Sequence, residues 1–220
     1  MNAPPRRIEA VIFDMDGLLC DTEAIYRDAF MECARDFGRD MPLAVFLSMI
    51  GTTDTASRAI VLRHFGPDFD VDAYWAAVRA HASAHLAQGA PLKAGAREIL
   101  DDLDALALPR AICTSSAHAE VRMHLGPSGI LARFAAVIAR GDYAHGKPAP
   151  DPYLAAAAAL GVAPEACLAL EDSHNGVRSA HAAGMMTVMV PDLLDATGEI
   201  RACCAHVMES LHGVRALLRG

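Results

Sequence analysis

The sequence lacks the long apolar runs of a membrane protein. Hydrophobic residues make up 53% of its 220 residues, but Arg, Asp or Glu interrupts every stretch before it reaches the ~20 apolar residues that a membrane span needs. The N-terminal segment Met1–Arg7 is followed at once by a strand-like run, with no apolar segment ending in a small-residue cleavage site. We therefore expect no membrane partner and a cytoplasmic location.

Paired cysteines and a basic surface are also missing. The six cysteines include no CxxC pair, and Cys113 and Cys167 lie in apolar runs, which favours reduced thiols over a disulfide framework. The formal net charge is -8, and no basic stripe is present that could follow a nucleic-acid backbone. Nucleic acid is therefore not expected as a partner, and local groups must bind any anionic substrate.

Lysine is scarce. Of the 19 basic residues, only Lys93 and Lys147 are lysines, and the rest are arginines. One of these two lysines lies in the segment Gly146-Lys147-Pro148. Taken alone, Lys147 is explained equally well by an exposed position and by a binding role.

Five short apolar runs predict strands buried on both faces of a sheet. These runs are Glu9–Phe13, Arg110–Cys113, Ala135–Ala139, Ala166–Leu170 and Met186–Val190. Between them lie stretches with helical periodicity, of which the clearest are Arg97–Leu106, Ala119–Leu125, Pro152–Leu160 and Gly176–Ala183. The alternation predicts an α/β fold with a doubly wound parallel sheet and a Rossmann-like core.

The first and second predicted strands are separated by far more than the ~30 residues of one βαβ crossover. Residues 18–89 contain no convincing strand and show helical periodicity in Ala24–Phe37, Thr55–His64 and Ala73–Leu86. They end at Gln88-Gly89-Ala90-Pro91, a plausible hinge. We therefore expect an α/β core formed by residues 1–17 and 90–220, and an inserted helical cap formed by residues 18–89.

Polar residues follow four of the predicted strands. They are Asp14-Met15-Asp16-Gly17, Thr114-Ser115-Ser116, Gly146-Lys147-Pro148 and Glu171-Asp172-Ser173. Ligands of parallel α/β sheets bind beyond the carboxyl ends of the strands, near the switch in strand order. Each motif alone also fits a loop or a helix cap, but the four together are harder to explain in that way.

These residue types are the ones that phosphoryl transfer requires. Of the two aspartates after the first strand, Asp14 and Asp16, one can attack phosphorus while the other manages the proton. A hard cation with oxygen ligands would cancel the repulsion between an aspartate and a phosphate dianion. Asp14 and Asp172 are the natural side-chain ligands of such a cation.

Three further groups can bind the transferring phosphoryl oxygens. Lys147 supplies a positive charge, and the Thr114 hydroxyl and the backbone amides around Ser115 supply hydrogen bonds. We therefore predict a phosphoric monoester hydrolase that acts on a small-molecule phosphate ester.

The chain resembles the haloacid dehalogenase-like hydrolase superfamily, in the branch of sugar-phosphate phosphatases and β-phosphoglucomutase. The resemblance spans nearly the whole chain and is strongest in Val11–Leu19, Gly146–Tyr153 and Glu171–Gly176. It implies a magnesium-dependent phosphatase with an aspartyl-phosphate intermediate. It also implies a helical cap inserted just after the first strand.

The same resemblance assigns roles to single residues. Asp14 would form the aspartyl-phosphate, and Asp16 would act as general acid and then as general base. Magnesium would bind Asp14, the backbone carbonyl of Asp16 and Asp172, with Glu171 supporting the metal site. Thr114 and Lys147 would bind the phosphoryl group.

Departures from family patterns limit the reaction. The dehalogenases lack the second aspartate and the metal, so Asp16 argues against dehalogenation. β-Phosphoglucomutases have a cap histidine where this chain has Tyr26, and an arginine where it has Asp54, which favours hydrolysis over mutase chemistry. A phosphosugar mutase stays an alternative. A phospho-acceptor signalling domain is a more distant one, because such domains are shorter and have no inserted cap.

Overall fold

A six-stranded parallel sheet forms the centre of the described part of the chain, which comprises residues 7–50, 52 and 54–219 of the computed structural model. The strands are β1 Ala10–Phe13, β2 Arg110–Ala117, β3 Ala136–Arg140, β4 Cys167–Glu171, β5 Met186–Met189 and β6 His206–Val207. Their order is β3-β2-β1-β4-β5-β6. The strand order therefore switches between β1 and β4, which confirms the predicted doubly wound sheet.

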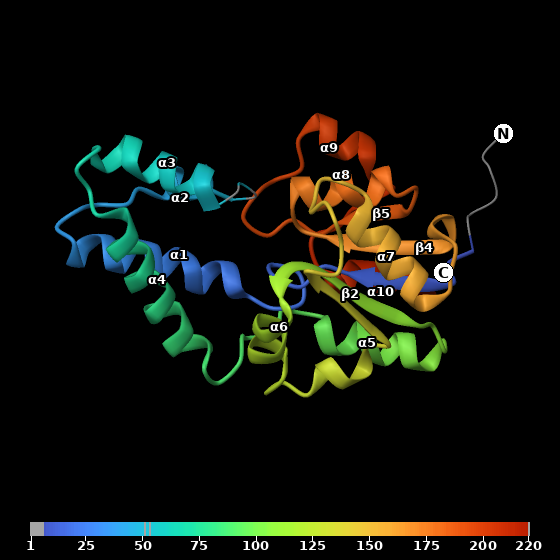
Figure 1. The fold of residues 1–220 in the computed structure, drawn as a ribbon. Helices are drawn as coiled ribbons and strands as arrows, with labels where there is room; N and C mark the ends of the chain where they lie inside the picture. The colour runs from blue at the N-terminus through green and yellow to red at the C-terminus, as the bar shows by residue number, and fades with distance from the viewer. Residues whose placement is uncertain (1–6, 51, 53, 220) are drawn as a thin grey trace.

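Helices cover both faces of this sheet (Figure 1). They are α5 Ala96–Ala105, α6 His118–Leu125, α7 Asp151–Leu160, α8 His174–Ala182, α9 Gly198–Cys203 and α10 Leu211–Arg219, with short 3-10 helices at Ile130–Arg133 and Pro164–Ala166. Successive side chains of a strand point to opposite faces. Ala10 and Ile12 of β1 pack in one core cluster with α7 and α8, whereas Val11 and Phe13 pack in another with α5 and α10.

Four more helices follow β1 and lie to one side of the sheet (Figure 1). They are α1 Thr22–Asp36, α2 Leu43–Leu47, α3 Asp54–Phe65 and α4 Val71–Leu86. Phe30 of α1 packs on two aromatic residues of α4, with ring centroids 5.2 Å from Trp75 and 5.8 Å from Tyr74. The Tyr74 hydroxyl also donates to the Phe30 carbonyl oxygen at 2.6 Å. The aromatic contacts hold α1 and α4 together.

The chain leaves the sheet for these four helices at one point and returns to it at another, and the two connecting segments lie side by side. The amide of Asp21 donates to the Pro91 carbonyl at 2.8 Å, and the amide of Lys93 donates to the Leu19 carbonyl at 3.0 Å. This pairing supports the proposal of a cap that enters and leaves the core by two adjacent linkers. The predicted boundaries at residues 18 and 89 stay a proposal.

The structure adds elements that the sequence pattern does not predict. Strand β6 has only two residues and helix α2 only five, which is too short for a periodic signal. Helix α10 is longer and buries Leu211 and Val214, three residues apart on one face. Strand β2 also continues to Ala117, four residues beyond its predicted end.

All six cysteines are free thiols, and both Cys113 and Cys167 are buried, as expected. No helix of the described residues has the length and apolar character that crossing a membrane requires. The expectation about the N-terminal segment rests mostly on residues 1–6, which lie outside the described part of the chain.

Candidate active site

The candidate active site begins where β1 ends. The amide of Asp14 donates to the Leu170 carbonyl of β4 at 3.0 Å, and the chain then leaves the sheet. Gly17 has φ +83, and a Cβ atom there would collide with the Asp172 carboxylate. Glycine therefore allows the loop after β1 to turn and to lie against the end of β4.

Three carboxylates meet at this edge of the sheet. Oxygen atoms of Asp14, Glu171 and Asp172 all lie within 4.8 Å of one another. Lys147 binds two of them, with its Nζ 2.5 Å from Asp14 Oδ1 and 2.6 Å from Glu171 Oε1. The same nitrogen donates to the Cys113 carbonyl at 2.9 Å. The side chain of Lys147 is only 6% exposed, so the solvent-facing reading of this residue is wrong.

Burial and neighbouring charges shift the pKa values of this cluster. Burial raises the pKa of Asp14 to about 8, against the opposing charge of Lys147. Burial also raises the pKa of Asp172, and the charges of Asp14 and Glu171 add to the effect. For Lys147, burial favours the neutral form, but the charges of Asp14 and Glu171 prevail and raise its pKa well above the usual value.

The cluster fits a hard divalent cation. Three carboxylates face one lysine, so a divalent ion would complete the neutralisation of their charge. All side-chain donors are oxygens, the ligands that Mg²⁺ prefers. Glu171 is fully buried, and Tyr153 donates to its Oε1 at 2.7 Å, which fixes the orientation of this carboxylate.

The side chain of Asp16 lies apart from the three carboxylates and among hydrogen-bond donors. Thr22 Oγ1 and Ser116 Oγ donate to it at 2.8 and 2.7 Å, and Nδ1 of the buried His124 lies 3.3 Å away. Burial alone would raise the pKa of Asp16, but these contacts, with His124 first, outweigh it and lower the pKa. The two neighbouring aspartates thus have opposite environments: burial raises the pKa of Asp14, whereas hydrogen-bond donors lower the pKa of Asp16.

The end of β2 lies beside Asp16. Thr114 is buried, and its hydroxyl accepts a hydrogen bond from the Ser116 amide at 3.0 Å. It also donates to Asp16 Oδ2 at 3.5 Å, so the hydroxyl already has partners in the protein. Ser115 borders a cavity of about 320 Å³ that also reaches Asp16. The structure thus brings both residues close to the aspartates.

Three contacts of Asp16 were missed by the sequence prediction. Ser116 belongs to the Thr114-Ser115-Ser116 motif. Side chains alternate between the two faces of a strand, so the spacing of two residues indicates that Ser116 and Thr114 share a face of β2. Thr22 is the first residue of α1, and His124 lies on α6. Neither belongs to a motif, so only the folded structure identifies them.

Comparison with known proteins identifies the family of this chain. A family model described as haloacid dehalogenase-like hydrolase matches residues 8–184. A Drosophila melanogaster protein named "Probable pseudouridine-5'-phosphatase" is 33% identical over 197 residues, covering 87% of this chain and 85% of that protein. Fructose-1-phosphate phosphatase YqaB of Escherichia coli is 30% identical over 195 residues, covering 84% of this chain and 97% of that protein.

A solved structure has the same architecture. CbbY from Rhodobacter sphaeroides in complex with phosphate superposes with a TM-score of 0.74 and 25% identity, covering 93% of this chain and 95% of that chain. The prediction of a phosphoric monoester hydrolase is confirmed at the level of the family and its phosphatase members. The chain belongs to the haloacid dehalogenase-like hydrolase family.

Proposed function

We propose that this protein is a Mg²⁺-dependent phosphatase that hydrolyses a small phosphate monoester, a sugar phosphate or a related metabolite, through an aspartyl-phosphate on Asp14. One observation carries the proposal. A buried aspartate paired with Lys147 at 2.5 Å stands next to a second aspartate, Asp16, that is held by separate donors. The names of the two phosphatase relatives support the choice of substrate.

The reaction has two steps. Asp14 attacks phosphorus in line with the leaving oxygen, and Asp16 protonates that oxygen as the ester bond breaks. Asp16 then takes a proton from water, which attacks phosphorus, releases inorganic phosphate and restores Asp14. The donors around Asp16 hold its carboxylate in place for both proton transfers.

The remaining residues bind the phosphoryl group and the cation. Lys147, the Thr114 hydroxyl and the amides around Ser115 would hold the phosphoryl oxygens. Asp14, the Asp16 backbone carbonyl and Asp172 would hold Mg²⁺, with Glu171 in support. When bound, the cation supplies positive charge that offsets the charge of the phosphate.

Residues 18–89, as the cap, would close over the site and exclude water before the first step. The two adjacent linkers are suitable hinges. Backbone hydrogen bonds join them at Asp21–Pro91 and at Lys93–Leu19. Opening of the cap would then release the products.

The contacts of Asp54 favour hydrolysis over the mutase alternative. Where the mutases have an arginine, Asp54 accepts hydrogen bonds from Trp75 Nε1 at 2.9 Å and from Arg58 Nε at 2.7 Å. Gly51 and Thr53, which precede Asp54 in that alignment, lie outside the described residues. A carboxylate in this position cannot hold the second phosphate of a bisphosphate intermediate as an arginine can.

The test is phosphate release from sugar phosphates, phosphoglycolate, nucleotides and an aryl phosphate, each with Mg²⁺ and with EDTA. We expect Mg²⁺-dependent release, and a loss of at least about 10³-fold in Asp14→Asn with the fold retained. Asp28→Asn, which removes an exposed carboxylate of α1, is the matched control and should keep full activity. Isomerised sugar phosphate without free phosphate would identify a mutase instead. Normal activity of Asp14→Asn would refute the nucleophile.

A further inference from the structure

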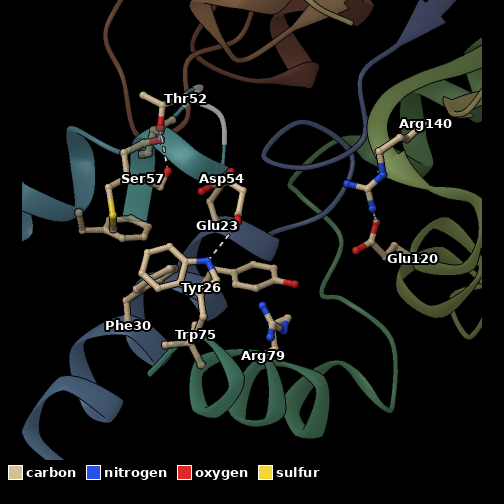
Figure 2. A pocket seen from close by; sticks show the side chains of 14 residues that line it. Glu23, Tyr26, Phe30, Thr52, Asp54, Ser57, Trp75, Arg79, Glu120 and Arg140 are labelled. Atoms are coloured by element: carbon tan, nitrogen blue, oxygen red, sulfur yellow. Dashed lines mark hydrogen bonds and ion pairs between the residues drawn. The ribbon is translucent and has the colours of Figure 1, made fainter. Parts of the chain in front are cut away.

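A second cavity lies among the helices that follow β1. Its volume is about 480 Å³, within the range of small-molecule sites. Much of its wall is aromatic or apolar, with Tyr26 and Phe30 from α1, Phe46 from α2, and Trp75 and Val78 from α4. Figure 2 shows Phe30 and Trp75 on one side of this space and Arg140 with Glu120 on the opposite side.

This cavity adjoins the smaller one beside Asp16. Four residues border both of them: Glu23, Tyr26, Glu120 and Arg140. A phosphate ester whose phosphoryl group reaches Asp14 would therefore direct its alcohol part past Glu23 and Tyr26 toward Trp75. For such an ester, this cavity, whose lining is partly apolar and partly polar, would be the far end of the substrate site.

Three polar groups of the cavity have no partner within the protein. Among the described residues, the Glu23 carboxylate, the Tyr26 hydroxyl and the Arg79 guanidinium make no hydrogen bond or ion pair, whereas Arg140 pairs with Glu120 at 3.3 Å. A carboxylate accepts hydrogen bonds from hydroxyls, and a guanidinium donates to carbonyl oxygens. The near part of the cavity thus suits hydroxylated carbons, and the region of Arg79 suits a carbonyl-bearing group.

Three other ligands fit this cavity less well. A second phosphate would have one unpaired arginine, Arg79, as its partner, and would lie beside the Glu23 carboxyl group, whose pKa burial raises to about 7. A cationic group would lie beside Arg79. A bare sugar would leave the partly exposed rings of Tyr26 and Phe30 in contact with water. An uncharged planar ring fits these walls, because rings stack on aromatic side chains with little desolvation cost.

We propose that this cavity binds an uncharged heteroaromatic ring with carbonyl oxygens, carried by the alcohol part of the substrate beyond hydroxylated carbons, as in a nucleoside monophosphate. The ring packs on Tyr26 and Phe30 above the buried Trp75, Arg79 donates to a ring carbonyl, and Glu23 accepts from the hydroxyls of the sugar. This inference rests on the proposed function, because it takes the phosphoryl end of the site as given.

The first experiment compares two substrates that share one sugar. With Mg²⁺, kcat/KM for uridine 5′-monophosphate should exceed that for ribose 5-phosphate by about 10-fold or more, as expected for stacking of one base. Tyr26→Leu, which removes the flat ring, should lower this ratio about 10-fold. Tyr26→Phe should preserve it. Arg35→Ala, on the exposed side of α1, is the matched control and should preserve it too.

The second experiment needs no turnover, because Trp75 is the only tryptophan of the chain. Its fluorescence, excited at the red edge of its absorption, should change on addition of uridine and not on addition of ribose. In Tyr26→Leu, half-saturation should need about 10-fold more uridine. Arg35→Ala should match the wild type.

The outcomes separate this inference from the proposed function. If uridine changes Trp75 fluorescence but no ester is hydrolysed, the proposed function is wrong and the ring site stands. If both esters are hydrolysed with equal kcat/KM and uridine leaves the fluorescence unchanged, the ring site is wrong and the phosphatase stands. A preference for ribose 1,5-bisphosphate over uridine 5′-monophosphate would also overturn the ring site.

Discussion

Replacing Lys147 with methionine tests whether one lysine stabilises the carboxylates at the end of the sheet. Methionine keeps most of the apolar stem and removes the charge. In the wild type, Lys147 Nζ lies 2.5 and 2.6 Å from two buried carboxylates, and its side chain is 6% exposed. Without it, Asp14 and Glu171 lose the only cation that forms an ion pair with them among the described residues.

The expected loss of stability is large. Removing one partner of a buried ion pair typically costs about 3–5 kcal/mol, because the other charge stays buried and uncompensated. With an m-value of about 3 kcal/mol/M, the urea midpoint of Lys147→Met should fall by about 1 M or more. Added Mg²⁺ should recover part of this loss, and should stabilise the variant more than the wild type.

The chain contains its own control, because its only other lysine is Lys93. Lys93 Nζ lies 2.6 Å from Asp192 and 3.7 Å from Asp21, but its side chain is 27% exposed. An ion pair so open to solvent contributes about 0–1 kcal/mol. Urea unfolding in EDTA should therefore separate Lys147→Met clearly from Lys93→Met. Equal midpoints for the two variants would refute the reasoning about the buried cluster.

Three further predictions concern the same region. In EDTA, the free energy of unfolding should fall as the pH rises between 3.8 and about 8. The reason is that the pKa of Asp14 is raised in the folded state, so the folded protein binds a proton that the unfolded chain has lost. Urea midpoints measured across this pH range test the prediction, and a flat profile would contradict it. Tyr153→Phe removes the hydroxyl that donates to Glu171 at 2.7 Å and should lower the free energy of unfolding by about 1.5–3 kcal/mol. Tyr143→Phe removes a half-buried hydrogen bond of 3.1 Å to a backbone carbonyl and should lower it by about 1 kcal/mol or less in the same assay. Gly17→Ala should cost about 1–2 kcal/mol from its positive φ, and should weaken Mg²⁺ binding measured by calorimetry, because the new methyl group displaces a neighbouring carboxylate.

The strands and the chemistry of the site could be predicted from sequence for one physical reason. Strands buried on both faces must be apolar along their whole length, so a polar residue marks the point where such a strand ends. Parallel strands end at one edge of the sheet, and the structure brings Asp14, Lys147 and Asp172 together there. Helices α9 and α10 were not predicted, although α10 has a clear apolar face at Leu211 and Val214.

The hydrogen-bond partners of Asp16 could not be predicted from the sequence in this way. Ser116 binds Asp16 across 100 positions of sequence, and it is found only because β1 and β2 are neighbours in the sheet. His124 reaches the same carboxylate from α6, a position set by how that helix packs. No spacing in the sequence encodes such a contact.

The far end of the substrate site depends even more on packing than the partners of Asp16. Tyr26, Trp75 and Arg140 border one cavity from α1, α4 and β3, and each taken alone is an ordinary aromatic or surface residue. Sheet topology constrains the residues that do the chemistry, but it does not constrain those that select the substrate. Helices on an inserted segment can change their side chains without disturbing the strand ends. Relatives that share the residues at the ends of β1 and β4 are therefore expected to act on different phosphate esters, and the aromatic wall of this cavity is the feature to compare among them.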